Sequence, residues 1–324
     1  MQIKVVVFST EQTKTSYTLQ EIEKSLLQKG LFDFSFLSTS SFEELVSIYK
    51  DLKEEHIFVV CENDFIDKFV EQVRSSSDKI ALIDEQAIKI DSQTVFKNTM
   101  IVPIEVEFQK FLDKFASGET AFVCSIFGKS RSFVESQFKE LSVEKFVVLT
   151  EGHFLHKVYY SKQLSRESLR NAFGLSIFSF EGESLQECCS KKLEGKMLSV
   201  AENLTKGNLA IRLAEKTSCL KDHFLILKEG DFEKIDIDKK FLDENGTVSK
   251  ETAFVMAKKL LKNCELAVAI TGFDCDAGRT FVAVGNKNEI NVFSSTFYGS
   301  SAEIIENVTD FALFRTLMFL KEKY

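Results

Sequence analysis

Strand-length apolar runs alternate with helical segments along the first 117 residues, and this alternation limits the fold more than any other feature of the sequence. Helices are predicted over 18–30, 41–52, 64–74 and 105–115, and capping-box patterns open the first two, at Thr18–Glu21 and Ser41–Glu44. The strand-like runs are Ile3–Phe8, Phe32–Leu37, His56–Cys61, Lys79–Ile83 and Met100–Val102. Strands that alternate with helices of this length indicate βαβ units around a mainly parallel sheet.

The rhythm changes after the boundary predicted at Ser117-Gly118. The stretch 119–182 favours the order β-α-β-β-α-β, a small split-βαβ module with antiparallel content. From 183 onward helices and strands alternate again, and Phe281–Gly285 and Glu289–Ser294 flank a turn that predicts a hairpin. We therefore expect an α/β protein of three domains, 1–117, 118–182 and 183–324, of which the first and third each contain a sheet between helices.

Charge and cysteine usage narrow the classes of partner. Lys and Arg number 41 against 49 Asp and Glu, a net charge of −8, and a surface of that sign does not favour binding to nucleic acid or anionic membranes. No apolar run approaches the roughly 18–20 residues of a membrane span. Met1 leads directly into a strand-like run, which predicts no signal peptide. The seven cysteines, at irregular spacings, are then typical of reduced and mostly buried thiols in a cytoplasmic protein.

Generic catalytic and metal motifs are scarce. The chain has no CxxC pair, HExxH or Walker A motif, and Gly128-Lys129-Ser130 is no phosphate loop because Val123 stands where its first glycine would be. His153 and His156 would fall on opposite faces of a strand, so we expect solvated histidines rather than a shared metal site. We expect neither a metal nor a cofactor.

Three segments of the last 125 residues carry a family resemblance. Ala-Glu-Asn-Leu-Thr-Lys-Gly-Asn-Leu-Ala at 201–210 resembles the signature Ala-Glu-Ser-Cys/Leu-Thr-Gly-Gly-x-x-Ala of the C-terminal domain of the CinA family. Gly246-Thr-Val-Ser-Lys-Glu251 is similar to its Gly-Ala-Val-Ser-x-Glu, and 267–272 to its Leu-Ala-Val-Thr-Gly strand end. Upstream, 101–106 resembles the end of the family's molybdopterin-binding-like domain, and Phe127-Gly128 resembles the entry to its KH-type module. The resemblance implies these three domains in this order: a three-layer α/β domain, the KH-type module and the CinA C-terminal domain.

The resemblance also implies a chemistry that two substitutions remove. The family's C-terminal domain is a nicotinamide-nucleotide amidase similar to a Ser–Lys hydrolase, in which a serine at a helix N-terminus attacks the carboxamide and a lysine takes its proton. The serine position is Asn203 here, and the family's loop length places the lysine position at Asp231. An amide is no acyl-forming nucleophile, and a carboxylate of reference pKa about 3.9 opposes a developing oxyanion. Losing both groups typically costs on the order of 10⁶ in rate.

Asn203 can nevertheless keep the helix, because Asn is among the best N-caps. The resemblance brings the signature loop and the Thr-Gly strand end into one cleft, where ligands of open α/β sheets gather. The expected lining residues are Glu202, Asn203, Thr205, Gly207, Thr271 and Gly272.

Other parts of the family pattern are altered. The glycine-rich loop that follows the Thr-Gly strand end in the family is replaced by 273–278. Ser9–Gln12 and Cys61–Asp64 lack the glycines that let backbone approach a phosphate. The middle module has no Gly-x-x-Gly loop, so its topology does not argue for RNA binding.

Three functions stay open on this reasoning. The first is a catalytically degenerate CinA-like binding or scaffold protein, homodimeric as its relatives are, with a small nucleotide-like ligand and no nucleic-acid or membrane partner. The second is an active nicotinamide-nucleotide amidase with a rearranged site. The third is an unrelated interaction protein on a similar α/β frame. A nucleophile within about 3 Å of a base would favour the second over the first.

Overall fold

The computed structural model describes residues 2–52, 56–73, 79–83, 88–90, 98–104, 112, 121–272 and 278–323. Within these ranges the chain is a mixed α/β protein with three sheets, of six, four and five strands. It forms two compact units: one comprises 1–122, 143–147 and 159–163, and the other 123–142, 148–158 and 164–324. Apart from residue 112, the helix predicted over 105–115 lies outside the described residues, as do the boundary at 117–118 and most of the altered loop at 273–278.

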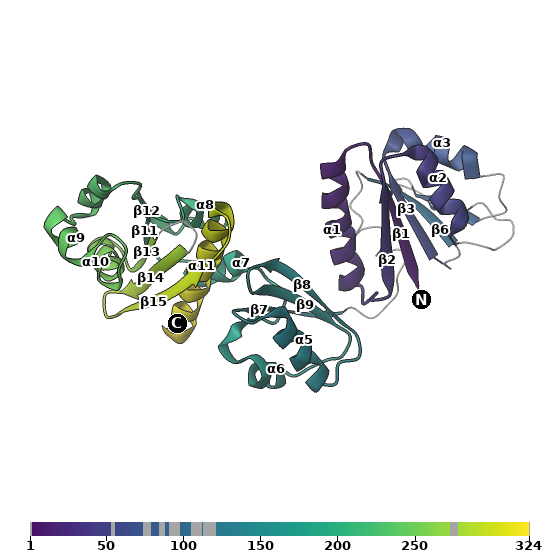
Figure 1. The fold of residues 1–324 in the computed structure, drawn as a ribbon. Helices are drawn as coiled ribbons and strands as arrows, with labels where there is room; N and C mark the ends of the chain where they lie inside the picture. Colours follow the sequence, from purple (N-terminus) through teal and green to yellow (C-terminus); the bar gives the residue numbers. More distant parts are fainter. Residues whose placement is uncertain are drawn as a thin grey trace. The chain divides into compact units, whose positions relative to one another are not determined.

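The first sheet lies between two layers of helices (Figure 1). Its strand order is β2-β1-β3-β6-β4-β5, and every neighbouring pair except β4 and β5 is parallel. Helix α1 (Gln12–Gln28) packs on one face, and α2 (Phe42–Asp51) and α3 (Asn63–Val73) pack on the other. The strands are β1 (Ile3–Phe8), β2 (Phe34–Thr39), β3 (His56–Cys61), β4 (Lys79–Ile83), β5 (Ile88–Ile90) and β6 (Asn98–Pro103).

The two capping-box predictions in this unit have different outcomes. Ser41 caps α2, accepting a hydrogen bond from the backbone N–H of Glu44, as predicted. The predicted start of α1 at Thr18 is wrong, because the helix already begins at Gln12. The Thr18 hydroxyl donates to the carbonyl of Lys14, one turn back inside the helix, which a mid-helix threonine does readily.

The second sheet has the order β10-β7-β9-β8, and its elements follow the order predicted for 119–182. They are β7 (Phe122–Phe127), α5 (Arg131–Glu140), β8 (Phe146–Gly152), β9 (Leu155–Tyr160), α6 (Arg166–Phe173) and β10 (Ile177–Ser179). The expectation of a solvated His156 is wrong. Its imidazole is buried, with Nε2 2.9 Å from the carbonyl oxygen of Lys129 and Nδ1 3.1 Å from the Thr150 hydroxyl, and burial lowers its pKa.

The third sheet, which we call the C-terminal sheet, has the order β12-β11-β13-β14-β15. Strands β12, β11 and β13 are parallel, and β14 and β15 form the predicted hairpin. The strands are β11 (Leu198–Glu202), β12 (Leu220–Leu225), β13 (Leu266–Gly272), β14 (Gly278–Asn286) and β15 (Ile290–Phe297). The helices are α7 (Leu185–Leu193), α8 (Asn208–Ala214), the 3₁₀-helix η2 (Glu229–Ile235), α9 (Lys239–Asn245), α10 (Lys250–Leu260) and α11 (Ser301–Lys323).

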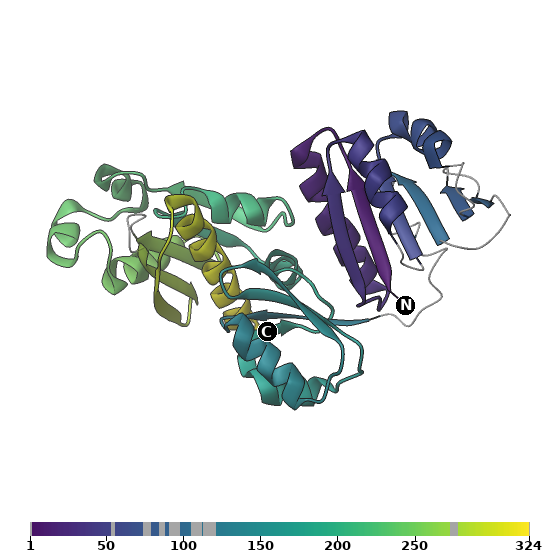
Figure 2. The ribbon, with the colours of Figure 1, turned by 45° about the vertical axis from the view of Figure 1, so that its right-hand side comes forward.

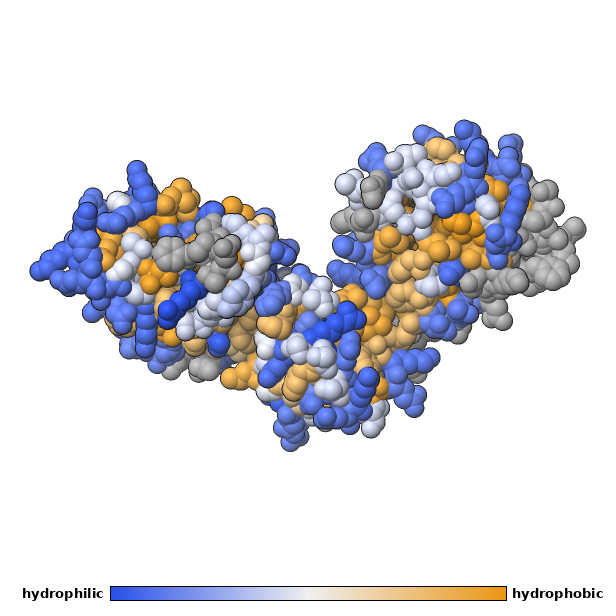
Figure 3. All heavy atoms as spheres, in the orientation of Figure 1, coloured by the Kyte–Doolittle hydropathy of each residue, from blue (hydrophilic) through white to orange (hydrophobic). Residues whose placement is uncertain are grey.

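Helices cover both faces of the C-terminal sheet (Figures 1 and 2). On one face α7, α8 and α11 bury a core around Val200, Val268 and Leu317. On the other, α10 packs on Ala201, Ala267 and Ala269, whose small side chains let the helix approach the sheet. In Figure 3 hydrophilic residues predominate around α9. No described helix is both long and apolar enough to cross a membrane. The six cysteines within the described ranges are free and buried, as predicted.

A β-bulge in β12 decides which side chains meet each face of the C-terminal sheet. Leu198 of β11 pairs with Leu220, but Ser199 pairs with Asp222, so Lys221 is an extra residue in β12. Because side chains alternate along a strand, this one residue exchanges the faces for everything after it. Asp222 and Phe224 join Ser199 on the α10 face, and His223 joins Val200 and Glu202 on the α8 face.

Candidate functional site

The carboxyl ends of β11, β12 and β13 meet at one edge of the C-terminal sheet, which we call the carboxyl edge. Strand β11 lies between the other two. After β11 the chain forms β12 on one side of it, and later forms β13 on the other side. In open α/β sheets ligands bind at such a reversal of strand order. Of the six predicted lining residues, Glu202 ends β11, Thr271 and Gly272 end β13, and Asn203, Thr205 and Gly207 lie in the turn after β11.

Asn203 joins the ends of two strands. Its backbone N–H donates to the carbonyl of Ile270 at 3.1 Å, and its side-chain amide donates to the carbonyl of Ile226 at 3.0 Å. Its amide oxygen accepts from the N–H of Gly272 at 3.4 Å. The predicted capping of a helix by Asn203 is wrong, because α8 begins only at Asn208 with Gly207 as its N-cap. Left-handed backbone at Lys206 and Gly207 places a turn between Asn203 and the helix.

Glu202 takes the capping role instead. Its carboxylate is fully buried and accepts hydrogen bonds from the backbone N–H groups of Leu209 at 3.2 Å and Ala210 at 3.0 Å, and from the hydroxyl of Thr205. A negative charge here also complements the helix dipole. Burial by itself raises the pKa of Glu202, but hydrogen bonds from His223, Thr205 and Ala210 lower it by more, so the pKa lies below its ordinary value.

His223 is a site residue that the sequence analysis missed. Its Nε2 lies 3.0 Å from Oε1 of Glu202, and its side chain is 29% exposed. A buried carboxylate that holds one imidazole nitrogen orients the ring and leaves the other nitrogen to act on a proton. His223 also lies against the signature loop, since a Cβ added to Gly207 would be 3.8 Å from Cε1 of the ring. No motif surrounds His223, and only the bulge at Lys221 turns it toward Glu202.

Asp231 is held by its own turn. Its Oδ2 accepts from the N–H groups of Leu227 at 3.0 Å and Lys228 at 3.1 Å, and its Oδ1 lies 2.9 Å from the ammonium of Lys234. The hydrogen bond from Lys234, followed by the two backbone N–H groups, lowers the pKa of this carboxyl. Asp231 thus caps the 3₁₀-helix η2, next to the segment that accepts the Asn203 side chain.

The end of β13 meets the second resemblance motif. The buried hydroxyl of Thr271 donates to the carbonyl of Thr247, in the segment similar to Gly-Ala-Val-Ser, and Ser249 of the same segment caps α10. Gly272 has no room for a side chain: an added Cβ would lie 2.7 Å from Cδ2 of Leu204 and 2.8 Å from the carbonyl oxygen of Arg279. The structure therefore brings the three motifs together, and that their residues line one ligand pocket stays a prediction.

A carboxylate joins the two altered loops at the strand ends of the first sheet. Ser9 and Thr10 follow β1 and Glu62 follows β3, and Oε1 of Glu62 accepts from the Ser9 hydroxyl at 2.8 Å and from the Thr10 N–H at 3.0 Å. An anion that approached these strand ends would meet the Glu62 charge. This arrangement fits the loss of the phosphate-approach glycines.

Glu202 gives a testable pH dependence. Because its pKa is lower in the folded protein, the ionised carboxylate contributes stability that is complete above the ordinary pKa of 4.5 and is lost as pH falls through the folded value. We expect the free energy of unfolding of the wild type to exceed that of Glu202→Gln at pH 7, and the excess to shrink below pH 4.5. Urea unfolding of both proteins across this range measures it; an excess independent of pH would contradict the prediction.

Comparisons with known proteins agree with the sequence motifs. Residues 182–320 match the family model of the CinA C-terminal domain. A putative competence-damage inducible protein of Finegoldia magna is 26% identical over 167 residues, 48% of this chain and 41% of that protein. A CinA-like protein of Mycobacterium tuberculosis is 31% identical over 124 residues, 36% of this chain and 29% of that protein. The matched part of the chain thus spans less than half the length of these curated relatives.

Solved structures of similar proteins match the same share of the chain. A CinA superfamily protein from Klebsiella pneumoniae is 19% identical with a TM-score of 0.40, and the match covers 43% of this chain and 96% of that one. A competence/damage inducible protein from Agrobacterium tumefaciens is 24% identical with a TM-score of 0.38, covering 42% of this chain and 95% of that one.

Proposed function

We propose that the chain is a CinA-like binding or scaffold protein without amidase activity, and the match of residues 182–320 to the family model of the CinA C-terminal domain is the premise. The single observation that carries the proposal is the use of Asn203. Both polar atoms of its side chain are hydrogen-bonded, one to Ile226 just after β12 and the other to Gly272 at the end of β13, where a Ser–Lys hydrolase would place an attacking hydroxyl.

The state of Asp231 supports the same proposal. Three donors hold its carboxylate, and its lowered pKa makes it a weak base near neutral pH. The charge also opposes an oxyanion and a phosphate-bearing ligand alike.

The proposal extends to the rest of the chain by the family resemblance. It comprises a homodimer in the cytoplasm, a small nucleotide-like ligand at the carboxyl edge, and three domains at 1–117, 118–182 and 183–324. The first would be a degenerate molybdopterin-binding-like domain and the second a KH-type module.

The test is an assay of nicotinamide mononucleotide deamidation, with release of ammonia or nicotinic acid mononucleotide as the readout. We expect no release by the wild type where an active CinA-type amidase turns over, and none by Asn203→Ser, because the base is still missing. Asn203→Ser with Asp231→Lys is expected to recover no more than a trace. Release by the wild type that is lost on changing Lys206 or Lys228, but not on changing Asn203, would overturn the proposal in favour of a relocated site.

The Glu202–His223 pair favours one second candidate, an amidohydrolase with a rearranged site. In this reading His223, oriented by Glu202, takes a proton from water, and the water oxygen attacks the amide carbon. Ammonia release by the wild type that His223→Gln abolishes and Asn203→Ser leaves intact would support this candidate over the first.

A further inference from the structure

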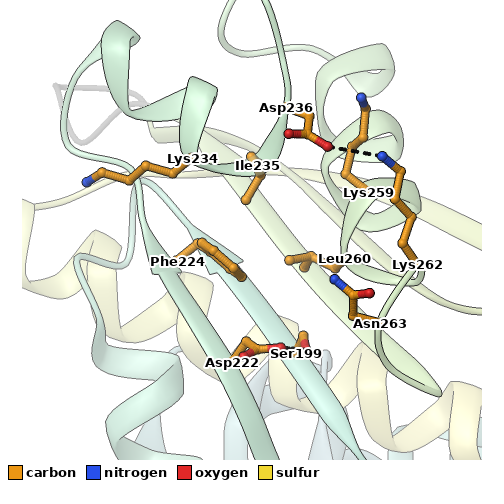
Figure 4. A pocket seen from close by; sticks show the side chains of 10 residues that line it. All are labelled: Ser199, Asp222, Phe224, Lys234, Ile235, Asp236, Lys259, Leu260, Lys262 and Asn263. Atoms are coloured by element: carbon orange, nitrogen blue, oxygen red, sulfur yellow. Dashed lines mark hydrogen bonds and ion pairs between the residues drawn. The ribbon is translucent and has the colours of Figure 1, made fainter.

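A cavity of about 170 Å³ lies on the α10 face of the C-terminal sheet, apart from the carboxyl edge. In Figure 4 the side chains of Phe224 and Leu260 stand on opposite sides of it, Ile235 lies above, and Ser199 and Asp222 lie below. Ser199 is near the amino end of β11, whereas Glu202 is its last residue. The cavity, which we call the Phe224 cavity, is therefore a site distinct from the one that the family motifs mark.

The sequence builds this cavity through the bulge and through the end of α10. The extra residue Lys221 turns Asp222 and Phe224 onto the α10 face. Helix α10 ends at Leu260, and the turn after it carries Lys262 and Asn263. Segment 234–236 of η2 and its C-cap closes the side opposite the sheet.

Polar groups in the cavity differ between the floor and the rim. The floor holds the Asp222 carboxylate, which accepts a hydrogen bond from the nearly inaccessible Ser199 hydroxyl at 3.2 Å. Lysines 234, 259 and 262 also line the cavity. Lys262 pairs with Asp236 at 3.0 Å, and Lys234 pairs with Asp231 at 2.9 Å. The site thus combines an aromatic wall, an acidic floor and a lysine-rich rim.

Size and chemistry together select a ligand class. A dry cavity of roughly 150 Å³ holds a benzene ring, so the Phe224 cavity is large enough for one six-membered ring. Phe224 offers a face on which such a ring can stack. An ionised carboxylate accepts hydrogen bonds but donates none, so Asp222 favours a ring whose edge carries an amino group. In protein–DNA complexes, Asp and Glu recognise the N4 amine of cytosine in this way. The rim lysines suit a phosphate attached to the ring through a sugar.

We propose that the Phe224 cavity binds a cytidine nucleotide, with the cytosine ring against Phe224, its amino group donating to Asp222, and its phosphate near Lys259 and Lys262. Uracil presents a carbonyl oxygen where cytosine presents the amine, and that oxygen would face the Asp222 carboxylate. The preference for cytidine is therefore set by a repulsive contact as well as by a new hydrogen bond. The proposal does not depend on the function proposed for the carboxyl edge.

The test is isothermal titration of the full chain with cytidine monophosphate, uridine monophosphate and cytidine. We expect the cytidine nucleotide to bind at least about tenfold more tightly than the uridine nucleotide. The isosteric change Asp222→Asn should reduce this preference to about threefold or less. Phe224→Leu should weaken both nucleotides about tenfold through lost stacking. Lys259→Ala should weaken cytidine monophosphate but not cytidine.

Matched controls locate the site. Lys239→Ala, which removes a 75% exposed lysine outside the cavity lining, should leave the affinity for cytidine monophosphate unchanged, and circular dichroism checks that each variant is folded. If Phe224→Leu does not fold, Asp222→Asn still decides the proposal. Equal binding of the two nucleotides, no binding at millimolar ligand, or binding that Asn203→Ser abolishes and Asp222→Asn retains, would each overturn it. None of these outcomes bears on the amidase assay.

Discussion

Replacing Glu202 by Ala is expected to lower the free energy of unfolding by about 3–5 kcal/mol. The change removes a fully buried carboxylate and leaves the N–H groups of Leu209 and Ala210 without their acceptor at the start of α8. It also leaves a cavity beside the core of that face. Urea unfolding at pH 7, with the denaturant slope compared between variants, measures the loss.

Two matched variants separate the causes of this loss. Glu202→Gln keeps one acceptor oxygen and should lose only about 1–2 kcal/mol. Glu229→Ala removes a carboxylate of the same domain that is 52% exposed and lies 3.9 Å from Lys239, and it should cost no more than about 1 kcal/mol. A Glu202→Ala protein within about 1 kcal/mol of the wild type would show that Glu202 does not hold the start of α8.

Gly272→Ala is expected to destabilise the protein by about 1–3 kcal/mol, because the added methyl group overpacks the end of β13. The neighbour at 2.8 Å is the backbone carbonyl oxygen of Arg279, which cannot turn away, and the neighbour at 2.7 Å is Leu204 in the signature loop. Thermal unfolding measures the change in stability.

Gly230→Ala is the matched control for this substitution. A Cβ at Gly230 would meet no heavy atom within 4 Å, and its backbone is not in the left-handed region. The control should be neutral or more stable by up to about 1 kcal/mol, since alanine restricts the unfolded chain. Equal losses in the two variants would contradict the close packing at Gly272.

The fold class and most strand positions follow from local patterns. Apolar runs such as Ile3–Phe8 and His56–Cys61 are strands at those bounds, and Ser41 caps the helix that it was expected to cap. The predicted ends of helices are wrong where one local sequence pattern is compatible with two structures. The pattern at Thr18 lies inside a helix, since a threonine there can bond back to the preceding turn as easily as it can cap.

The candidate site could be predicted only in part. The resemblance motifs led to Asn203 and Gly272, which hydrogen-bond to each other. The cap of α8 was assigned to Asn203 because Asn is a good local cap, whereas the structure uses Glu202, whose carboxylate reaches forward across a turn. His223 could not be found, because its direction depends on how β12 pairs with β11, and pairing is a property of the folded sheet.

The extra residue in β12 makes both faces of this sheet sensitive to the same insertion or deletion. The bulge at Lys221 sets the direction of the His223 imidazole on one face and of the Phe224 ring on the other. A codon lost or gained there would carry His223 away from Glu202 and Phe224 away from its cavity in a single event. Base changes, in contrast, can alter either side alone. In descendants of this chain, the site around His223 and the cavity around Phe224 can therefore change independently only while the number of residues in β12 is preserved.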